Sequence, residues 1–552
     1  MSYKKNNNQI DIIWDIDDLP INYPLEVKDT YRKIYYQNRK NYTNWVDKIG
    51  KKFSSDIDWW MTLPSYRNPY AGKLLNYLTV LDTIQKLKKK EIILKTKSPN
   101  FVSVVKANFG RSNIKAETNS KKENFGSMTL KYIKSLIFQV FLYIFISISQ
   151  KKEDISGKKI VLIDKFFTFK KKQNLNYFPN LGKIKNIRII PTIIPTFNLV
   201  KLIKILRSLN KNKEKIIFKE QYLKLSDLFF AFNHFFRRKK FLNEIYYYKS
   251  INISELVHEE ISNYDDFYSI NNGLLNYKFF YRLSKNRVNV LKSFNWFENQ
   301  IIDKGWNLGF RNFFPNQQKN SFGYQDFNKH FNLISNSPSA LEKLSKVTPE
   351  KIIIISNYFK KITKEFTKNQ KIIIGQSARF KNLISQNQLA FKKRKKILLV
   401  LCGIKNIDIE LLKLAMKVCL LKKDLKIFIK PHPILDLRDI IPSRDLPKNL
   451  VILFEDLNKI LKRSLICITA GPSSALLESA YHGAYNILPE VECGAEENLK
   501  IFNLNKSNFS VVQNSEELLN KIIFIMKNKR RIKIKKIKNL NSKLKKISSL
   551  LN

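Results

Sequence analysis

A Lys-Pro-His-Pro tetrapeptide at residues 430–433 carries the clearest chemical signal in the sequence. It follows a buried strand predicted over residues 425–430, and the ligand crevice of a parallel sheet lies beyond the carboxyl ends of its strands. Pro431 and Pro433 restrict the backbone, so we expect His432 to project into this crevice beside Lys430. An imidazole there can donate to a phosphate or protonate a leaving oxygen. The tetrapeptide alone is equally compatible with a proline-bounded turn that carries a solvated histidine.

A second signal lies at residues 469–478, where a strand runs into a Gly-Pro turn and two serines open a helix. Gly471 belongs to the turn, Ser473 or Ser474 is a natural N-cap, and free amides at a helix N-terminus bind anions. Glu478 lies one turn into the helix, where it either accepts from a ribose hydroxyl or faces solvent. A capped helix without a ligand explains the turn alone. Together with His432, the turn places two anion-binding features on neighbouring strand ends of one sheet.

Glu298 is the candidate general base, because it follows a buried strand predicted over residues 288–294 and should face the crevice. Capping the helix that follows is its alternative role. The chain has five histidines, and no H-x-x-x-H or H-E-x-x-H pair occurs among them. The histidines therefore offer no metal motif, and a D-x-D match at Asp15 and Asp17 carries little weight because it lies among polar residues.

Strands alternate with helices through the second half of the chain. Strands are predicted at residues 396–402, 425–430, 450–454, 465–469 and 485–488, with helices at 408–421, 456–463 and 474–482. Such alternation predicts an α/β fold with a doubly wound parallel sheet. Further strands are predicted at residues 159–164, 288–294, 351–356 and 371–375, and they belong to an earlier domain.

The length of 552 residues exceeds that of one ordinary core, so several domains are expected. We predict an N-terminal α/β segment over 1–110, with a strand at 56–61. A linker over 111–130 and an N-terminal domain over 131–375 should follow it. A C-terminal domain over 376–526 and a basic tail over 527–552 complete the prediction.

The formal net charge of +54 does not by itself indicate a nucleic-acid partner. Lys, Asn and Ile are enriched along the whole chain, as an AT-rich coding sequence would produce, whereas a nucleic-acid binder concentrates its charge in a patch or motif. We therefore predict no nucleic-acid partner. The four cysteines form no C-x-x-C pair and no signal peptide opens the chain, which predicts a reduced, cytoplasmic protein.

One apolar, uncharged segment, residues 135–149, lies between lysines at 131 and 134 and lysines at 151 and 152. Its 15 residues are short for a membrane span, which needs about 20. Two interpretations stay open. The segment is a buried helix of the N-terminal domain, or it contacts the inner leaflet with its flanking lysines on lipid phosphates. The second interpretation predicts a peripheral location on the inner face of the cell membrane.

The stretch that contains the Lys-Pro-His-Pro motif, ITAGPSS, ALLESAYHG and YNILPE resembles the donor half of GT-B glycosyltransferases. It is most similar to bacterial capsule, sialyl- and polysialyltransferase-type enzymes, which carry a His-Pro and a Ser-Ser motif. More broadly, the chain resembles surface carbohydrate biosynthesis proteins of lipopolysaccharide or O-antigen clusters. Residues 59–60, 65–69, 297–300 and 323–325 also resemble that family, and the motif-bearing part covers residues 395–505.

This resemblance implies two Rossmann-like domains that face a cleft, with additional N-terminal helices. It also implies transfer of a sugar from a nucleotide-activated donor to a surface-polysaccharide or lipid-linked acceptor. CMP is favoured as the nucleotide of the donor. Residues 376–526 would bind the donor without a metal or other cofactor. His432 would act on the donor phosphate, and Arg67 would either contact an acceptor phosphate or be a solvated loop arginine. The catalytic residues would be His432 and Glu298, and the donor-binding residues Lys430, Pro433, Gly471, Ser473, Ser474 and Glu478.

Three alternatives share some of these features. Polyol-phosphate transferases with CDP-glycerol-like donors share the Lys-Pro-His-Pro motif and a Ser-Ser turn. Sugar-nucleotide 2-epimerases share the fold but should carry Ser-Gly-Gly where this chain has Pro472, Ser473 and Ser474. A non-catalytic basic protein at the membrane surface would bind polyanions without responding to nucleotide sugars.

Overall fold

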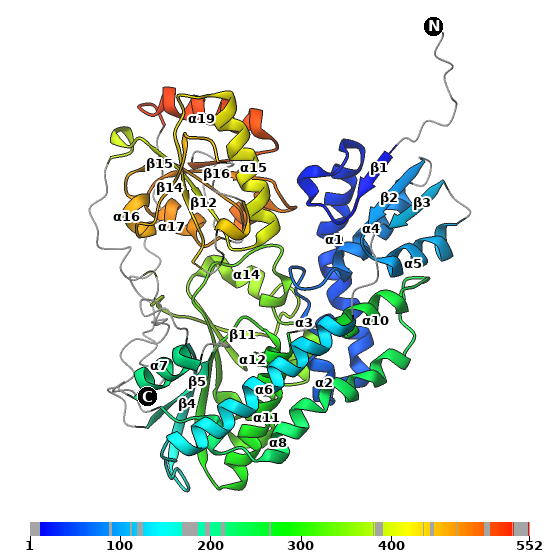
Figure 1. Cartoon of the computed structure of the whole chain (residues 1–552), viewed down its shortest axis with the longest axis vertical. Helices are drawn as coiled ribbons and strands as arrows, with labels where there is room; N and C mark the ends of the chain where they lie inside the picture. The colour runs from blue at the N-terminus through cyan, green and yellow to red at the C-terminus, as the bar shows by residue number, and fades with distance from the viewer. Residues whose placement is uncertain are drawn as a thin grey trace.

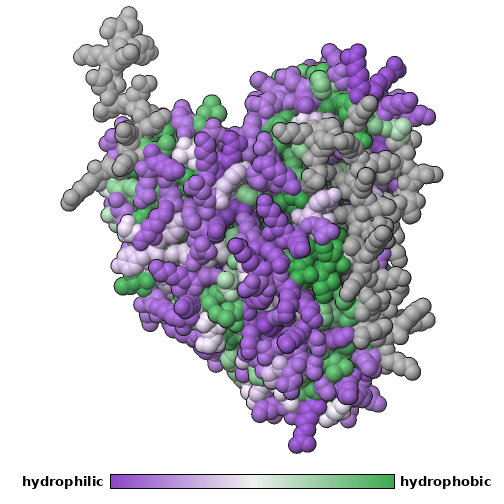
Figure 2. Space-filling model, turned by 180° about the vertical axis from the view of Figure 1, so that it is seen from behind, coloured by the Kyte–Doolittle hydropathy of each residue, from purple (hydrophilic) through white to green (hydrophobic). Residues whose placement is uncertain are grey.

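The computed structural model contains three parallel sheets and one short antiparallel ribbon among the residues that it describes (Figure 1). These are residues 12–87, 91–110, 113–118, 125–167, 186–193, 199–210, 216–263, 266–378, 380, 390–433, 435, 437–441, 446–471, 473–501, 508–532, 534 and 550. The antiparallel ribbon consists of β6 (Tyr247–Tyr248) and β7 (Ile251–Asn252). The face of the molecule in Figure 2 is mostly hydrophilic, in keeping with the excess of lysine.

The N-terminal unit is a three-stranded parallel sheet in the order β1-β2-β3, packed against helices. Its strands are β1 (Ile12–Asp15), β2 (Ile92–Thr96) and β3 (Ile114–Thr118), and its main helices are α1 (Leu25–Gly50), α4 (Leu74–Leu87) and α5 (Pro99–Phe109). Buried and exposed residues alternate in β1, as expected of a strand with one solvated face. Residues 111–130, predicted to be a linker, in fact contain β3 and the start of the next helix.

The prediction of a strand at residues 56–61 is wrong. These residues form the short helix α2 (Ile57–Trp60), followed by α3 (Leu63–Tyr66). The Asp56 carboxylate accepts from the amide of Asp58 at 3.0 Å, which caps the first turn. Trp59 and Trp60 are both buried, and a short apolar run of this kind does not distinguish a strand from a buried helical turn.

The middle domain is a six-stranded parallel sheet in the order β11-β10-β9-β8-β4-β5. Its strands are β4 (Lys159–Phe167), β5 (Ile187–Ile193), β8 (Asn289–Trp296), β9 (Ser321–Gln325), β10 (Lys351–Ile354) and β11 (Lys371–Ile374). Alternate residues of β4 enter two core clusters: Ile160 and Leu162 pack with α11 (Phe267–Lys285) and α12 (Ile301–Phe313). Val161 and Ile163 pack with α6 (Phe125–Ser149) and α7 (Leu199–Asn210).

Shorter helices complete this part of the chain, and the one over residues 254–263 packs against α4 and α5 of the N-terminal unit. They are α8 (Leu225–Phe232), α9 (His234–Arg237), α10 (Ser254–Asn263), α13 (Ala340–Leu344) and α14 (Lys360–Thr363). The helix predicted at residues 135–149 is longer than expected, since α6 begins at Phe125.

The C-terminal domain is a second six-stranded parallel sheet, in the order β14-β13-β12-β15-β16-β17. Its strands are β12 (Lys396–Val400), β13 (Ile427–Lys430), β14 (Leu450–Ile452), β15 (Ser464–Thr469), β16 (Tyr485–Pro489) and β17 (Phe509–Val512). Its helices are α15 (Lys405–Leu421), α16 (Leu457–Leu461), α17 (Ala475–Tyr481), α18 (Ala495–Ile501) and α19 (Ser515–Asn528). The direction of the strand order reverses between β12 and β15, so the switch point of the sheet lies there.

The carboxyl edges of the two large sheets meet at the loop after β9, residues 326–339. The amide of Phe331 donates to Asn498 Oδ1 at 2.7 Å, and the side chain of Asn332 donates to the Cys493 carbonyl at 2.6 Å. Both partners follow β16 in the C-terminal domain. The predicted fold class is therefore confirmed: two Rossmann-like, doubly wound parallel-sheet domains face each other, and the N-terminal unit is additional to them.

Candidate active site

His432 lies against the loop that follows β12. Gly403 in this loop has a φ of +85°, and a Cβ atom there would lie 2.8 Å from Cγ and Cε1 of the His432 ring. The Asp408 carboxylate fixes the loop, because it accepts from the amides of Cys402 at 2.7 Å and Gly403 at 2.8 Å. The position therefore requires glycine for two reasons, a left-handed backbone and close contact with the imidazole.

The other residues of the tetrapeptide surround this contact. Lys430 is the last residue of β13 and pairs with Val400 of β12. Its side chain is half-buried, as is His432, whereas Pro433 is exposed. These residues thus lie at the carboxyl edge of the sheet, next to its switch point.

The turn after β15 reaches the switch point from the other side. The Ser473 hydroxyl accepts from the amide of Ala475 at 3.2 Å, and the Ser474 hydroxyl donates to Glu478 Oε1 at 3.4 Å. Ser473 supplies the side-chain contact at the start of α17, although Ser474 holds the N-cap position. Glu478 is 6 % exposed, so it does not face open solvent.

Gly471 packs this turn against the middle domain. A Cβ atom at Gly471 would lie 2.5 Å from Nε2 of His330, which leaves no space for a larger residue. The His432 and Ser473 loops were expected on neighbouring strand ends, but β12 lies between β13 and β15. The two loops consequently flank the loop after β12 rather than each other.

Glu298 follows β8 in the middle domain. Its carboxylate accepts from Trp296 Nε1 at 2.7 Å and from Gln300 Nε2 at 2.8 Å, so two neighbours fix its orientation. The helix-capping role considered for Glu298 belongs to Asp303, whose carboxylate accepts from the amides of Glu298 and Gln300. Strand β8 pairs with β4, and the strand order of the middle sheet reverses between them. Glu298 therefore lies at the switch point of its own sheet.

Sequence reasoning missed a His-Glu-Tyr cluster, centred on the buried His330, in which all three parts of the chain meet. His330 Nε2 lies 3.0 Å from Glu492 Oε1, and His330 Nδ1 lies 3.1 Å from the Tyr70 hydroxyl, which donates to Glu492 Oε2 at 2.8 Å. Burial, and then the Glu492 carboxylate, raise the pKa of Tyr70 well above its ordinary value. His330 follows β9 by five residues, so the strand-end rule that selected His432 would also have found it.

Arg67 is neither a phosphate contact nor a solvated arginine. Its guanidinium donates to Glu342 Oε2 at 2.6 Å, and Lys304 Nζ lies 3.0 Å from Glu342 Oε1; all three side chains are buried. Burial raises the pKa of Glu342, but Arg67 and then Lys304 lower it more, to about 2. The cluster joins the N-terminal unit to the middle domain.

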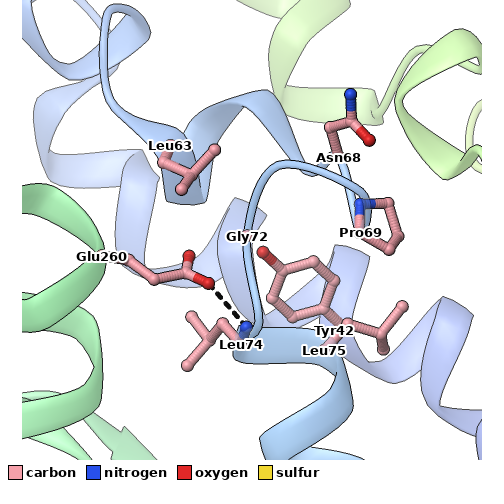
Figure 3. Close-up of a pocket in the computed structure, with 8 residues that line it drawn as sticks. All are labelled: Tyr42, Leu63, Asn68, Pro69, Gly72, Leu74, Leu75 and Glu260. Atoms are coloured by element: carbon pink, nitrogen blue, oxygen red, sulfur yellow. Dashed lines mark hydrogen bonds between the residues drawn. The ribbon is translucent and has the colours of Figure 1, made fainter. Parts of the chain in front are cut away.

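The depression in Figure 3 is a structural feature of the N-terminal unit. Glu260 points into it and accepts from the amide of Leu74 at 2.6 Å, which caps the start of α4 (Figure 3). Burial raises the pKa of Glu260 to about 7. The carboxylate occupies the space beside Gly72 and so leaves no room for a ligand.

No protein-family model matches the chain, and no curated protein sequence matches it. Among solved structures the chain is similar to the glycotransferase of kitacinnamycin, with a TM-score of 0.37 and 9 % identity over 68 % of this chain and 92 % of that one. It is also similar to MurG of Acinetobacter baumannii, with a TM-score of 0.35 and 10 % identity over 68 % and 92 % of the two chains. It is similar to TarM with a TM-score of 0.37 and 12 % identity over 68 % of this chain and 94 % of that one. Similarity this distant carries no argument about activity, and the fold class rests on the two sheet orders.

Proposed function

We propose that the protein is a glycosyltransferase that moves a sugar from a nucleotide-activated donor to a surface-polysaccharide or lipid-linked acceptor. A CMP-type donor is favoured, and the reaction uses no metal. One observation carries the proposal: His432 lies over the glycine loop after β12, next to the switch point of a doubly wound sheet. Nucleotides bind in this crevice of such sheets, because the loops on either side diverge there.

In this proposal the donor phosphate binds between the loop after β12 and the turn at Ser473. The His432 imidazole donates a hydrogen bond to the departing phosphate as the bond to the sugar breaks, which stabilises the developing negative charge. Lys430, half-buried on the same strand end, adds positive charge. The hydroxyl of Ser474, which donates to Glu478 at 3.4 Å, would exchange that partner for an oxygen of the donor.

In the same proposal the acceptor binds to the middle domain, where Glu298 removes the proton from the attacking hydroxyl. Hydrogen bonds from Trp296 and Gln300 hold the carboxylate in one orientation. Such preorganisation matters, since a base acts only within hydrogen-bond reach of the proton that it removes.

A thermal-shift panel tests the donor site. CMP, UDP, GDP, CDP-glycerol and CMP-sialic acid are added to wild type, to His432→Ala and to a control, His258→Ala. His258 lies in α10, far along the chain from the C-terminal sheet. Its ring nitrogen Nε2 donates to the Glu244 carbonyl at 2.9 Å. A ligand at a hundred times its Kd stabilises the folded state by about 2.7 kcal/mol. We expect a shift in wild type and in the control, and a smaller one in His432→Ala.

The same panel separates the alternatives. A response to CDP-glycerol alone would replace the sugar donor by a polyol-phosphate donor on the same site. Heparin, a polyanion, is added in a parallel measurement. A response to heparin, with none to any nucleotide, would contradict the enzyme proposal and favour a non-catalytic basic protein.

A further inference from the structure

Helix α6 presents an apolar stripe to solvent along most of its length. The exposed residues recur at spacings of three, four or seven, so they lie on one face of the helix. The stripe consists of Leu130 (52 % exposed), Ile133 (44 %), Ile137 (62 %), Ile144 (49 %) and Ile148 (81 %). Large apolar side chains rarely line up in this way on a surface that faces only water.

The opposite face of α6 is built into the protein. Phe138, Leu142 and Ile146 belong to the core cluster that includes β4 and β5, and Gln139 beside them is 1 % exposed. By length and composition, residues Thr129–Ser149 are apolar enough to cross a membrane, although 22 % of the most apolar window is buried in the protein. A crossing would require the packed face to leave the domain, whereas a helix that lies in the plane of a membrane surface keeps it.

Two neighbouring helices extend the stripe. Leu225 and Phe229 of α8 and Phe236 of α9 are 58 %, 65 % and 57 % exposed. Tyr132 of α6 donates to the Phe232 carbonyl at 3.0 Å, so the helices are held together. Figure 1 shows α6 and α8 side by side on the face turned to the viewer, opposite the mostly hydrophilic face in Figure 2.

The surroundings of this apolar face are basic. Residues 129–150 contain no aspartate or glutamate, and Lys134, Lys151 and Lys152 are exposed at the two ends of α6. In residues 224–241 the single acidic residue is Asp227, which is buried and paired with Arg282 at 2.8 Å. Lys224 and Lys239 on the same segment are exposed. Glu153 and Asp154 follow Lys151 and Lys152, and Glu153 is paired with Arg188 and Lys158. An apolar face with a rim in which lysines predominate is complementary to a bilayer with anionic headgroups.

We propose that the α6–α8–α9 face docks in the plane of an anionic phospholipid bilayer. The exposed isoleucines, leucines and phenylalanines enter the boundary between headgroups and acyl chains, and the lysines lie at the phosphates. This binding is independent of nucleotide sugars, so its failure and the failure of the proposed transfer reaction are distinguishable.

Vesicle sedimentation tests the proposal with the full chain. Vesicles of phosphatidylcholine alone, and of phosphatidylcholine with phosphatidylglycerol, are mixed with wild type and with the triple variant Ile137→Ser, Ile144→Ser, Phe229→Ser. The control variant, Leu420→Ser, Leu421→Ser, Phe454→Ser, changes side chains of the C-terminal domain that are 64 %, 54 % and 84 % exposed. Circular dichroism and thermal melting establish that both variants fold.

We expect wild type and the control to bind the anionic vesicles, with weaker binding to phosphatidylcholine alone. The triple variant should lose affinity by at least roughly tenfold, because apolar burial supplies much of the binding. Equal binding by the triple variant, or no binding by wild type, would overturn the proposal. A wild-type dimer that becomes a monomer in the triple variant would overturn it too, in favour of a second copy of the chain on this face.

Discussion

At the residue scale, Gly403 controls where the His432 ring lies. Replacing it with alanine should cost about 1–2 kcal/mol of stability from backbone strain and also displace the imidazole. Gly157→Ala is a matched control, since Gly157 has a φ of +69° but no atom within 4 Å of an added Cβ. We expect both variants to lose stability in urea unfolding, and only Gly403→Ala to lose its nucleotide-induced thermal shift. A thermal shift of wild-type size in Gly403→Ala would show that this loop does not take part in donor binding.

Glu298 provides a test of the acceptor side. Glu298→Gln keeps the shape of the side chain and removes the base, so kcat should fall by roughly 10²–10⁴. The thermal shift with the donor should remain, because Glu298 belongs to the middle domain. Glu455→Gln, at an exposed ion pair with Arg463, is the control and should keep full activity. Loss of donor binding in Glu298→Gln would contradict the assigned role.

Glu260 makes stability depend on pH. Its pKa in the folded protein is about 7, above the value near 4.5 expected after unfolding, so the folded state holds the proton more tightly. The contribution is present in full below about pH 4.5 and is lost as the pH rises through 7, a change of up to about 3 kcal/mol. Urea unfolding of wild type and Glu260→Gln between pH 4.5 and 8 measures this. The variant should show a flatter profile, and Glu255→Gln, at an exposed carboxylate of the same helix, should match wild type.

At the scale of elements, the buried Arg67-Lys304-Glu342 cluster fastens α3 to α12 and α13. Glu342→Gln leaves two buried cations without their carboxylate and should cost about 3–5 kcal/mol. Glu91→Gln, at the exposed pair with Lys115, should cost less than about 1 kcal/mol. Urea denaturation compares the two. Equal costs would mean that the cluster contributes no more than a surface pair.

The strands of the C-terminal domain were predictable because they are short, buried and separated by amphipathic helices. Strand β13 ends at Lys430 and β15 at Thr469, as the sequence predicts. Strand β17 was missed, since its four residues, FSVV, are too few to show a clear period. The N-terminal unit was less predictable. Trp59 and Trp60 resemble a strand in the sequence because their burial depends on contacts with distant residues, Phe241 and Lys304.

Long-range contacts also explain which parts of the candidate site could not be predicted from the sequence. His432 and Ser473 were found from local motifs at strand ends. The partners of His330 are Tyr70 and Glu492, which are 260 and 162 residues away, so no local pattern relates them. The same holds for Arg67 and Glu342, which lie 275 positions apart.

At the scale of the whole molecule, the segment after β16 is where the three parts of the chain meet. Glu490 accepts from Arg32 of α1 at 3.1 Å, Glu492 contacts Tyr70 and His330, and the Cys493 carbonyl accepts from Asn332. These contacts hold the carboxyl edges of the two sheets in fixed relation. In the proposed reaction, the donor on one edge would face the acceptor on the other.

Hydrogen–deuterium exchange with and without the nucleotide that gives the largest thermal shift tests the donor site most directly. Backbone amides in residues 400–404, 430–433 and 470–478 should exchange more slowly with the nucleotide bound, because these loops surround the switch point of the C-terminal sheet. The N-terminal sheet should be unchanged, and His432→Ala should reduce the protection. Protection confined to other parts of the chain, or none at any nucleotide concentration, would contradict the donor site at His432.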